Sequence, residues 1–291
     1  ASTVTFASTK GIDGIWMEAV EAEYVNDGTI SDENFQKDGQ SVVKGLPFGW
    51  AIRYSNQPSK KTEGWMFYAP DEDATTFTLN EKAADPEADL LAMLDAVAKS
   101  SDDHKYSTIK LASNINVKDT IIVTSKVTLD LNEKTLSNTN PIWDIDKDKW
   151  SIISVRKGGD LTITGDGKLS AKENDTYAVD VQDGANLVIV SGEFIGNVHS
   201  VYVLEGSAEI KGGRYSIQQE YTDEPGKPYE FVLNLKDKNG ENGTASIVVT
   251  GGTFEKFDPD NNAAEGEGNS FLAEGYVSTE GPTDIYTVSK G

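Results

Sequence analysis

The sequence predicts a mainly β protein, with a small N-terminal antiparallel β domain followed by a parallel β-helix. Two observations favour this fold class. Short runs of alternating apolar and polar residues, separated by Gly, Pro, Asn and Asp, occur along most of the chain, which is typical of strands and turns. From Thr108 onward, a unit made of a strand, a turn with Gly and one large apolar residue recurs, as expected for a solenoid.

Residues 1–82 predict the small antiparallel β domain. Its strand-like runs lie at 3–6, 15–20, 48–54, 65–68 and 75–79. Three of the five Trp of the chain, Trp16, Trp50 and Trp65, fall in this part. We interpret them as core residues of a small domain, with a binding surface as the alternative.

Residues 85–99 are the one segment with clear helical periodicity. Asp85 suits the N-cap and Pro86 the first helical position. Leu90, Leu94 and Val97 then fall on one apolar stripe. Such a stripe must pack against another element, and we expect this helix to cover the first end of the β-helix, which spans 83–257.

The repeated unit predicts the coils of the β-helix. Its copies lie at 161–163 with 167–169, 187–189 with 192–194, 208–210 with 213–215 and 247–249 with 252–254, after a degenerate copy at 129–131 with 134–136. Gly167 and Gly192 are 25 residues apart, and Gly192 and Gly213 are 21 apart. The longer step to Gly252 predicts one coil plus protruding loops at 218–230 and 236–243. Leucine-rich repeats share this period, but their Leu and Asn pattern is absent.

Two segments near the start of these repeats, 108–117 and 127–136, resemble the opening coils of right-handed β-helix proteins of the pectate-lyase-like superfamily. The resemblance covers about residues 85–257 and implies a right-handed coil. Glu133 departs from it, because such sequences often carry Gly there. A fold of this kind does not by itself define a function.

The C-terminal segment 251–276, together with 285–288, is similar to the ends of β-helical structural proteins of tailed bacteriophages, including head-fibre and capsid-decoration proteins. This resemblance implies a virion protein that usually forms a homotrimer. Residues 1–82 would bind the major capsid protein and the β-helix would point outward. Residues 258–291 would form a C-terminal β cap, and the resemblance leaves room for weak adhesion to host-surface or mucus glycans.

The amino-acid composition excludes several classes of binding partner and site. The formal net charge is −22, so the field of the protein repels nucleic acid and anionic membrane surfaces. Cys is absent, which excludes disulfides and thiolate metal sites, and we expect no cofactor. No apolar run is long enough to cross a bilayer. The N-terminus shows no signal peptide, so we expect synthesis in a host cytoplasm and a final location in the virion.

Catalysis is the main alternative, either as a tailspike-like polysaccharide lyase or as a hydrolase; a bacterial surface adhesin is the third hypothesis. The Asp102-Asp103 pair follows the helix and lies outside the coils. Arg214 lies on a coil, yet no Asp cluster stands on the neighbouring coil. His199 has neither a second His nor a nucleophile near it in the sequence, so we predict a hydrogen-bonded structural residue at a coil corner. We therefore expect a protein that is not an enzyme.

One segment is a candidate for glycan or surface contact. It comprises Trp143, Asp144, Asp146, Asp148 and Trp150. Alternation would place the three carboxylates on one face, as a Ca²⁺ site or a glycan groove between two Trp. The alternative, which we favour, is a solvated loop whose Trp residues pack on the coils. The segment lacks the Gly and Glu of an EF-hand loop, and residues 258–262 fail the same test, so we expect no metal site.

Overall fold

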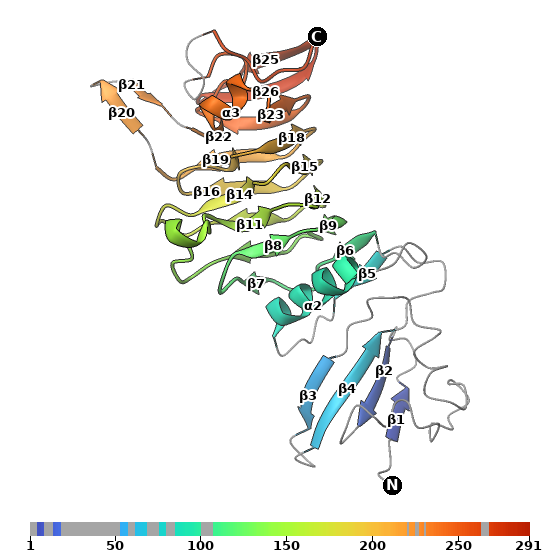
Figure 1. The fold of residues 1–291 in the computed structure, drawn as a ribbon. Helices are drawn as coiled ribbons and strands as arrows, with labels where there is room; N and C mark the ends of the chain where they lie inside the picture. The colour runs from blue at the N-terminus through green and yellow to red at the C-terminus, as the bar shows by residue number, and fades with distance from the viewer. Residues whose placement is uncertain are drawn as a thin grey trace. The chain divides into compact units, whose positions relative to one another are not determined.

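The computed structural model describes residues 5–8, 14–18, 53–57, 62–68, 76–79, 85–99, 107–219, 221–224, 227–229, 231–262 and 268–291. The chain forms two compact units, Ala1–Ile109 and Lys110–Gly291. Trp50 and the Asp102-Asp103 pair, which the sequence singles out, lie outside the described residues. The described part is mainly β (Figure 1).

The first unit contains a four-stranded antiparallel sheet. Its strands are β1 (Thr5–Ser8), β2 (Gly14–Glu18), β3 (Arg53–Gln57) and β4 (Thr62–Tyr68), in the order β1-β2-β4-β3. The strand β5 (Thr76–Thr78) and the helix α2 (Pro86–Lys99) follow. The Asp85 carboxylate accepts a hydrogen bond of 3.2 Å from the Ala88 amide, which makes it the N-cap that the sequence predicts. Leu90, Leu94 and Val97 on the apolar stripe are buried.

The second unit is a stack of coils in which each coil contributes one strand to each of three sheets. The strand β6 (Thr108–Lys110) leads into it. Sheet 1 contains β9 (Lys126–Asp130), β12 (Asp160–Thr164), β15 (Ala185–Ile189), β18 (Gly206–Ile210) and β23 (Ala245–Val249). Sheet 2 contains β7 (Ile115–Asn116), β10 (Thr135–Ser137), β13 (Lys168–Ser170), β16 (Glu193–Gly196), β19 (Arg214–Ile217) and β24 (Gly252–Glu255). Sheet 3 contains β8 (Ile121–Val123), β11 (Ser151–Val155), β14 (Tyr177–Val181), β17 (Val201–Val203) and β22 (Leu233–Leu235).

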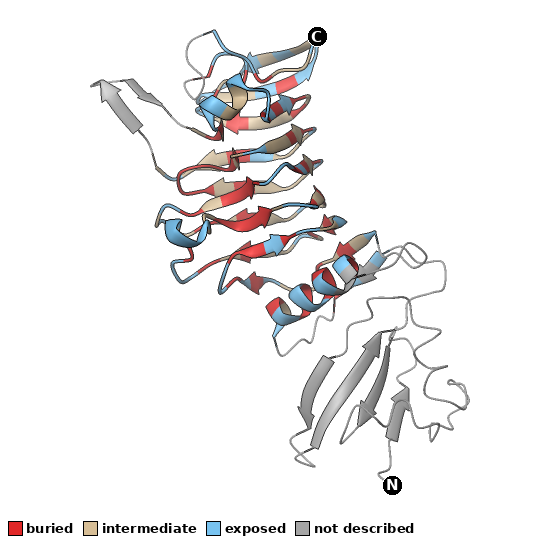
Figure 2. Ribbon diagram, viewed as in Figure 1, coloured by how far each residue is buried: buried red, intermediate tan, exposed pale blue. Residues whose placement is uncertain are grey.

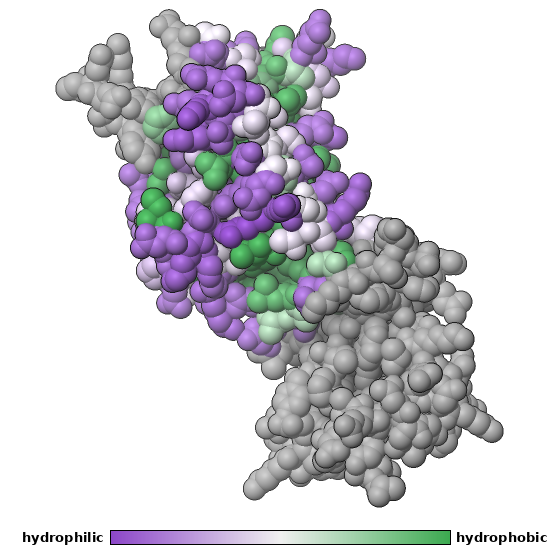
Figure 3. Space-filling model, in the orientation of Figure 1, coloured by the Kyte–Doolittle hydropathy of each residue, from purple (hydrophilic) through white to green (hydrophobic). Residues whose placement is uncertain are grey.

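Neighbouring strands within these three sheets are parallel. The chain passes from sheet 3 to sheet 1 to sheet 2 and then starts the next coil, as the order of β11, β12 and β13 shows. This is a β-helix-like arrangement, as the sequence predicts. The buried residues follow the coil strands (Figure 2), whereas the face drawn in Figure 3 is mainly hydrophilic with small hydrophobic patches.

The recurring large residue of the repeat forms a continuous inward ladder in sheet 2. Leu136, Leu169, Phe194, Tyr215 and Phe254 pair in register from coil to coil, and all five are buried. The ring centroids of Phe194 and Tyr215 are 5.3 Å apart, and those of Tyr215 and Phe254 are 4.9 Å apart, with both pairs nearly parallel. Rings at this separation stabilise each other beyond the area that they bury.

The register of sheet 1 corrects one detail of the repeat. Ile163 pairs with Ile189, as the aligned copies predict, but its partner on the preceding coil is Leu129 rather than Leu131. The sheet 1 strand of the degenerate copy is therefore displaced by two residues, whereas its sheet 2 half keeps the predicted pairing of Leu136 with Leu169. Because side chains alternate with a period of two, this displacement keeps Leu129 on the inward face, where it is buried.

The Gly of each repeat unit has a specific backbone role, shown at Gly213. Its φ is +97°, which residues with a Cβ rarely adopt. A Cβ at this position would also lie 2.9 Å from the Tyr215 hydroxyl oxygen. The turn therefore needs Gly both for its conformation and for the aromatic ladder beneath it.

A hairpin follows the last coil. The strands β25 (Tyr276–Glu280) and β26 (Ile285–Lys290) are antiparallel, and β26 pairs with β24. This is the terminal strand pair that the sequence predicts, with Phe271 and Val288 buried.

The two predicted loops contain secondary structure of their own. β20 (Tyr221–Glu224) and β21 (Lys227–Tyr229) form a hairpin within 218–230. The segment 236–243 contains the short helix α3 (Asp237–Glu241). The Asn239 side-chain amide donates a hydrogen bond of 2.5 Å to the Leu204 carbonyl, so this loop is attached to the coil before it.

Candidate functional site

The Trp143–Trp150 candidate segment folds as a tight turn beside sheet 3. The short helix η2 (Ile145–Lys147) interrupts the alternation that would place three carboxylates on one face. Asp144 caps η2, accepting a hydrogen bond of 3.1 Å from the Asp146 amide, and Lys147 Nζ lies 2.6 Å from Asp144 Oδ2. This hydrogen bond from Lys147 lowers the pKa of Asp144. Asp148 ends the turn with a φ of +52°.

One main-chain atom of the turn accepts two hydrogen bonds from the coils. The Asp148 carbonyl oxygen accepts hydrogen bonds from Arg156 Nη2 at 2.5 Å and from Gln182 Nε2 at 3.1 Å. Lys149 forms an ion pair with Asp119 at the other side of the turn. The segment is thus fixed on the outer side of sheet 3, and its main chain is used for packing.

A buried carboxylate supports these contacts. Asp180, in the middle of β14, is fully buried and accepts hydrogen bonds from Ser154 Oγ at 2.8 Å and from Gln182 Nε2 at 2.7 Å. Ser151 Oγ donates a third. Burial raises the pKa of Asp180 to about 6, although the three hydrogen bonds and Arg156 oppose this shift. Asp180 was not predicted from the sequence, where its only signal is a lone Asp within an apolar strand.

Aromatic side chains gather on the same side of sheet 3, on successive coils. We call this group the aromatic face, and it consists of Trp150, Tyr177, His199, Tyr202 and Phe231. The Tyr202 ring centroid lies 5.9 Å from that of Trp150, 5.6 Å from that of Tyr177 and 5.3 Å from that of His199. His199 lies 4.6 Å from Tyr177 and 6.2 Å from Phe231 by the same measure. All except His199 are partly exposed.

His199 is a buried structural residue within this face, as the sequence predicts. Its Nδ1 lies 2.8 Å from the Phe231 carbonyl oxygen, and because a carbonyl only accepts, Nδ1 carries the proton. Nε2 is then free to accept from the Asn234 amide, 3.5 Å away. Burial lowers the pKa of His199 to about 4, so the ring is neutral at physiological pH and packs as an uncharged aromatic.

Of the two Trp in the candidate segment, the structure brings one into the aromatic face. Trp150 meets Tyr202 edge to face, with the ring planes 73° apart. Within the described part of the chain, the Trp143 ring makes no contact with the rings of the aromatic face. Its indole nitrogen is buried and has no hydrogen-bond partner among the described residues.

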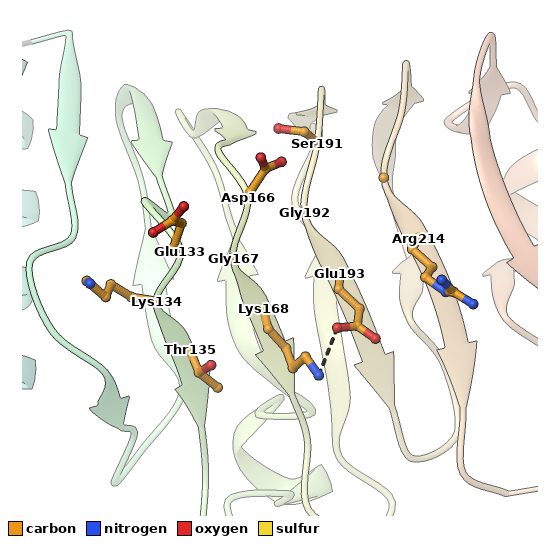
Figure 4. A pocket seen from close by; sticks show the side chains of 11 residues that line it. Glu133, Lys134, Thr135, Asp166, Gly167, Lys168, Ser191, Gly192, Glu193 and Arg214 are labelled. Carbon is orange, nitrogen blue, oxygen red and sulfur yellow. Dashed lines mark ion pairs between the residues drawn. The ribbon is translucent and has the colours of Figure 1, made fainter.

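A second feature is a groove of about 510 Å³ at the corners that lead into sheet 2 (Figure 4). Gly167, Gly192 and Gly213 leave it open. Its charged residues alternate in sign along the coils: Glu133, Lys134, Asp166, Lys168, Glu193 and Arg214. Lys168 and Glu193 form an ion pair of 2.8 Å. Arg214, which the sequence places on a coil, lines this groove beside Glu193.

The polar side chains of the remaining acidic segment, 258–262, form hydrogen bonds within their own turn. Asp258 Oδ1 accepts from the Asp260 amide at 3.0 Å, and Ser270 Oγ donates to Asp260 Oδ1 at 2.7 Å. The Asn262 amide donates to the Asn269 carbonyl. Across the residues that the structure describes, no group of three Asp, Glu or His is arranged to hold a metal ion.

Comparison with known proteins gives no relative: no protein-family model, no curated protein and no solved structure matches the chain. Among the described helices, none has the length and apolar character needed to cross a membrane.

Proposed function

We propose that this chain is a non-enzymatic structural protein of a tailed-phage particle, a head fibre or capsid-decoration protein. The observation that supports it is the stack of coils with an unbroken inward ladder from Leu136 to Phe254. Each coil is hydrogen-bonded to the next along three sheets, which produces a stiff element suited to projecting from a surface. The assignment to a phage particle rests on the similarity of the C-terminal segment to the ends of phage structural proteins.

The finer architecture belongs to the same proposal. The coil is right-handed, because a parallel strand–crossover–strand connection is right-handed in nearly all known cases. The proposal keeps the expectation from the sequence that the helix at 85–99 caps the first end of the coils, since an open end would expose sheet edges. Residues 1–82 bind the major capsid protein and the chain assembles as a homotrimer, as the resemblance implies.

The charge of the chain fits dense display. A formal net charge of −22 makes copies repel each other at short range and favours solubility. The repulsion is screened within about 8 Å at physiological salt, so it spaces neighbouring copies without preventing attachment. Capsid binding through residues 1–82 then has to overcome only the repulsion between copies that lie within this distance of each other.

The particle assignment is tested by separating heads from tails of purified phage and identifying their proteins by mass spectrometry. The proposal expects this chain in the head fraction at many copies per particle. A tail-only location contradicts a head fibre, and absence from both fractions favours the bacterial surface adhesin.

The charged groove favours one competing function, a polysaccharide lyase or hydrolase, because Glu133 and Asp166 line it on adjacent coils. The test is release of new chain ends from host capsular polysaccharide by the full chain. Our proposal expects no release above that of a Glu133→Gln/Asp166→Asn variant. Release by the wild type that this variant abolishes would establish the enzyme instead.

A further inference from the structure

Four of the five rings of the aromatic face remain partly exposed, and only His199 is buried. Sheet 3 turns its aliphatic residues inward, as Val179, Val201 and Val203 show with complete burial. Tyr202 lies between two of these on β17 and therefore points outward. It is only partly buried, and so are Trp150, Tyr177 and Phe231. Large rings that remain partly exposed and lie together on one side of a sheet are typical of a contact surface.

From this arrangement we infer that the aromatic face binds a neutral glycan, a role that rests on the proposed surface-display function. The apolar C–H faces of a pyranose ring stack on aromatic rings, while its hydroxyls need hydrogen-bonding groups around the stack. Both are present: Tyr202 supplies a ring and a hydroxyl, and Asn234 lies opposite Tyr202 on the next coil of sheet 3. Such a combination of apolar faces and few polar groups is typical of small-ligand sites.

The rings form a stepped surface rather than a flat one. The planes of Trp150 and Tyr177 are inclined by 73° and 61° to that of Tyr202, whereas His199 is nearly parallel to Tyr202. Successive coils are about 4.8 Å apart, which is of the order of one sugar ring. A glycan chain that runs along the coils would therefore meet a new aromatic group at each step.

Nearby charge selects the class of sugar. Burial, followed by the negative charges of Asp237 and Asp180, raises the pKa of Tyr202, so two carboxylates lie within electrostatic reach of its hydroxyl. The chain as a whole carries a net charge of −22. Uronates and sialates would be repelled from such a surface. The face therefore suits neutral sugars and is unsuited to acidic polysaccharides.

A hydrogen-bond network beneath the aromatic face fixes the position of Trp150 before a ligand binds. Asp180 pairs in register with Tyr202, and its hydrogen-bond network includes Gln182, which holds the Asp148 carbonyl. Trp150 follows that carbonyl by two residues. Fixing Trp150 before the ligand arrives reduces the ordering cost of binding.

The test is saturation-transfer NMR on the full chain with three probes: cellotetraose and chitotetraose as neutral oligosaccharides, and tetragalacturonate as an acidic one. We expect transfer to at least one neutral probe and none to tetragalacturonate. Tyr202→Ala and Trp150→Ala should each weaken neutral binding roughly tenfold, equivalent to about 1.4 kcal/mol. Tyr202→Phe keeps the ring and should retain most of the binding. Tyr276→Ala, a partly exposed Tyr on β25, is the matched control and should leave binding unchanged.

Three outcomes would overturn the inference. The first is no transfer to either neutral probe at millimolar concentration. The second is binding that both Tyr202→Ala and Trp150→Ala leave intact while Lys168→Ala/Arg214→Ala removes it, which would move the site to the charged groove. The third is dissociation of an oligomer by Tyr202→Ala in analytical ultracentrifugation, which would identify the face as an interface between copies. None of these outcomes changes the particle location, which is measured separately.

Discussion

The Asp180 carboxylate and the Ser154 hydroxyl are joined across adjacent coils by a hydrogen bond of 2.8 Å, and both residues are fully buried. They stand opposite each other in register on the outward side of sheet 3. The turn at 143–150 lies over them, because Gln182 and Arg156 connect this pair to the Asp148 carbonyl. A polar network outside the coil core thus positions the segment that carries Trp150.

Asp180 should make the protein less stable as the pH rises from 4 to 6. Its folded pKa of about 6 lies above the ordinary value of 3.8, so the folded state holds a proton that the unfolded state has lost. The stabilisation is complete below about pH 4 and is lost as the pH passes 6. By linkage the loss approaches roughly 3 kcal/mol in the free energy of unfolding. Urea unfolding of wild type and Asp180→Asn across this range measures the difference, and equal pH slopes would contradict it.

His199 should have the opposite effect. Its folded pKa of about 4 lies below the ordinary 6.5, so the unfolded state binds a proton first and stability falls as the pH drops from 6.5 to 4. The expected magnitude is again roughly 3 kcal/mol. The two slopes therefore largely cancel in the wild type between pH 4 and 6. His199→Gln should uncover the Asp180 slope in the same urea series. A His199→Gln profile parallel to that of the wild type would contradict the expected compensation between the two residues.

Removing the Tyr215 ring should destabilise the coils strongly. The ring is fully buried between Phe194 and Phe254, so Tyr215→Ala leaves a cavity and should cost about 3–5 kcal/mol. Tyr215→Phe loses only the 2.6 Å hydrogen bond from the hydroxyl to the partly exposed Gly212 carbonyl, which corresponds to about 0.5–1.5 kcal/mol. Thermal and urea unfolding of both variants checks the order. A similar loss in the two would show that the ladder is not tightly packed.

A pair of Gly variants separates backbone strain from steric contact. Gly213 and Gly243 both have positive φ, +97° and +73°. A Cβ at Gly213 would meet the Tyr215 hydroxyl, whereas one at Gly243 meets nothing within 4 Å. Gly243→Ala should therefore show the conformational cost alone, about 1–2 kcal/mol, and Gly213→Ala should cost clearly more. Equal melting temperatures for the two variants would argue against close contact between turn and ladder.

The sequence predicted the repeating part of the fold because the repeat is local. Gly213 and Tyr215 stand two residues apart, so the turn and the ladder residue appear together in each copy. The degenerate first copy lacks this Gly, yet its ladder residue Leu136 still pairs with Leu169 as the aligned copies predict. Only its sheet 1 strand is displaced by two residues, as the pairing of Leu129 with Ile163 shows.

The candidate site was predicted only in part because its contacts are not local. Trp150 was selected from the sequence, but its partner Tyr202 is reached only through the stacking of coils. The same holds for Asp180, whose three donors come from two coils. Alternation at 144–148 suggested three carboxylates on one face, yet the Asp144 cap and the η2 turn override that pattern locally.

The most direct measurement of the central claim is electron microscopy of purified phage particles with gold-labelled antiserum against the full chain. Pre-immune serum is the control for non-specific label. The account predicts gold distributed over icosahedral heads, because many copies would be anchored there through residues 1–82. Gold confined to the tail tip, or no phage-associated gold at all, would contradict it.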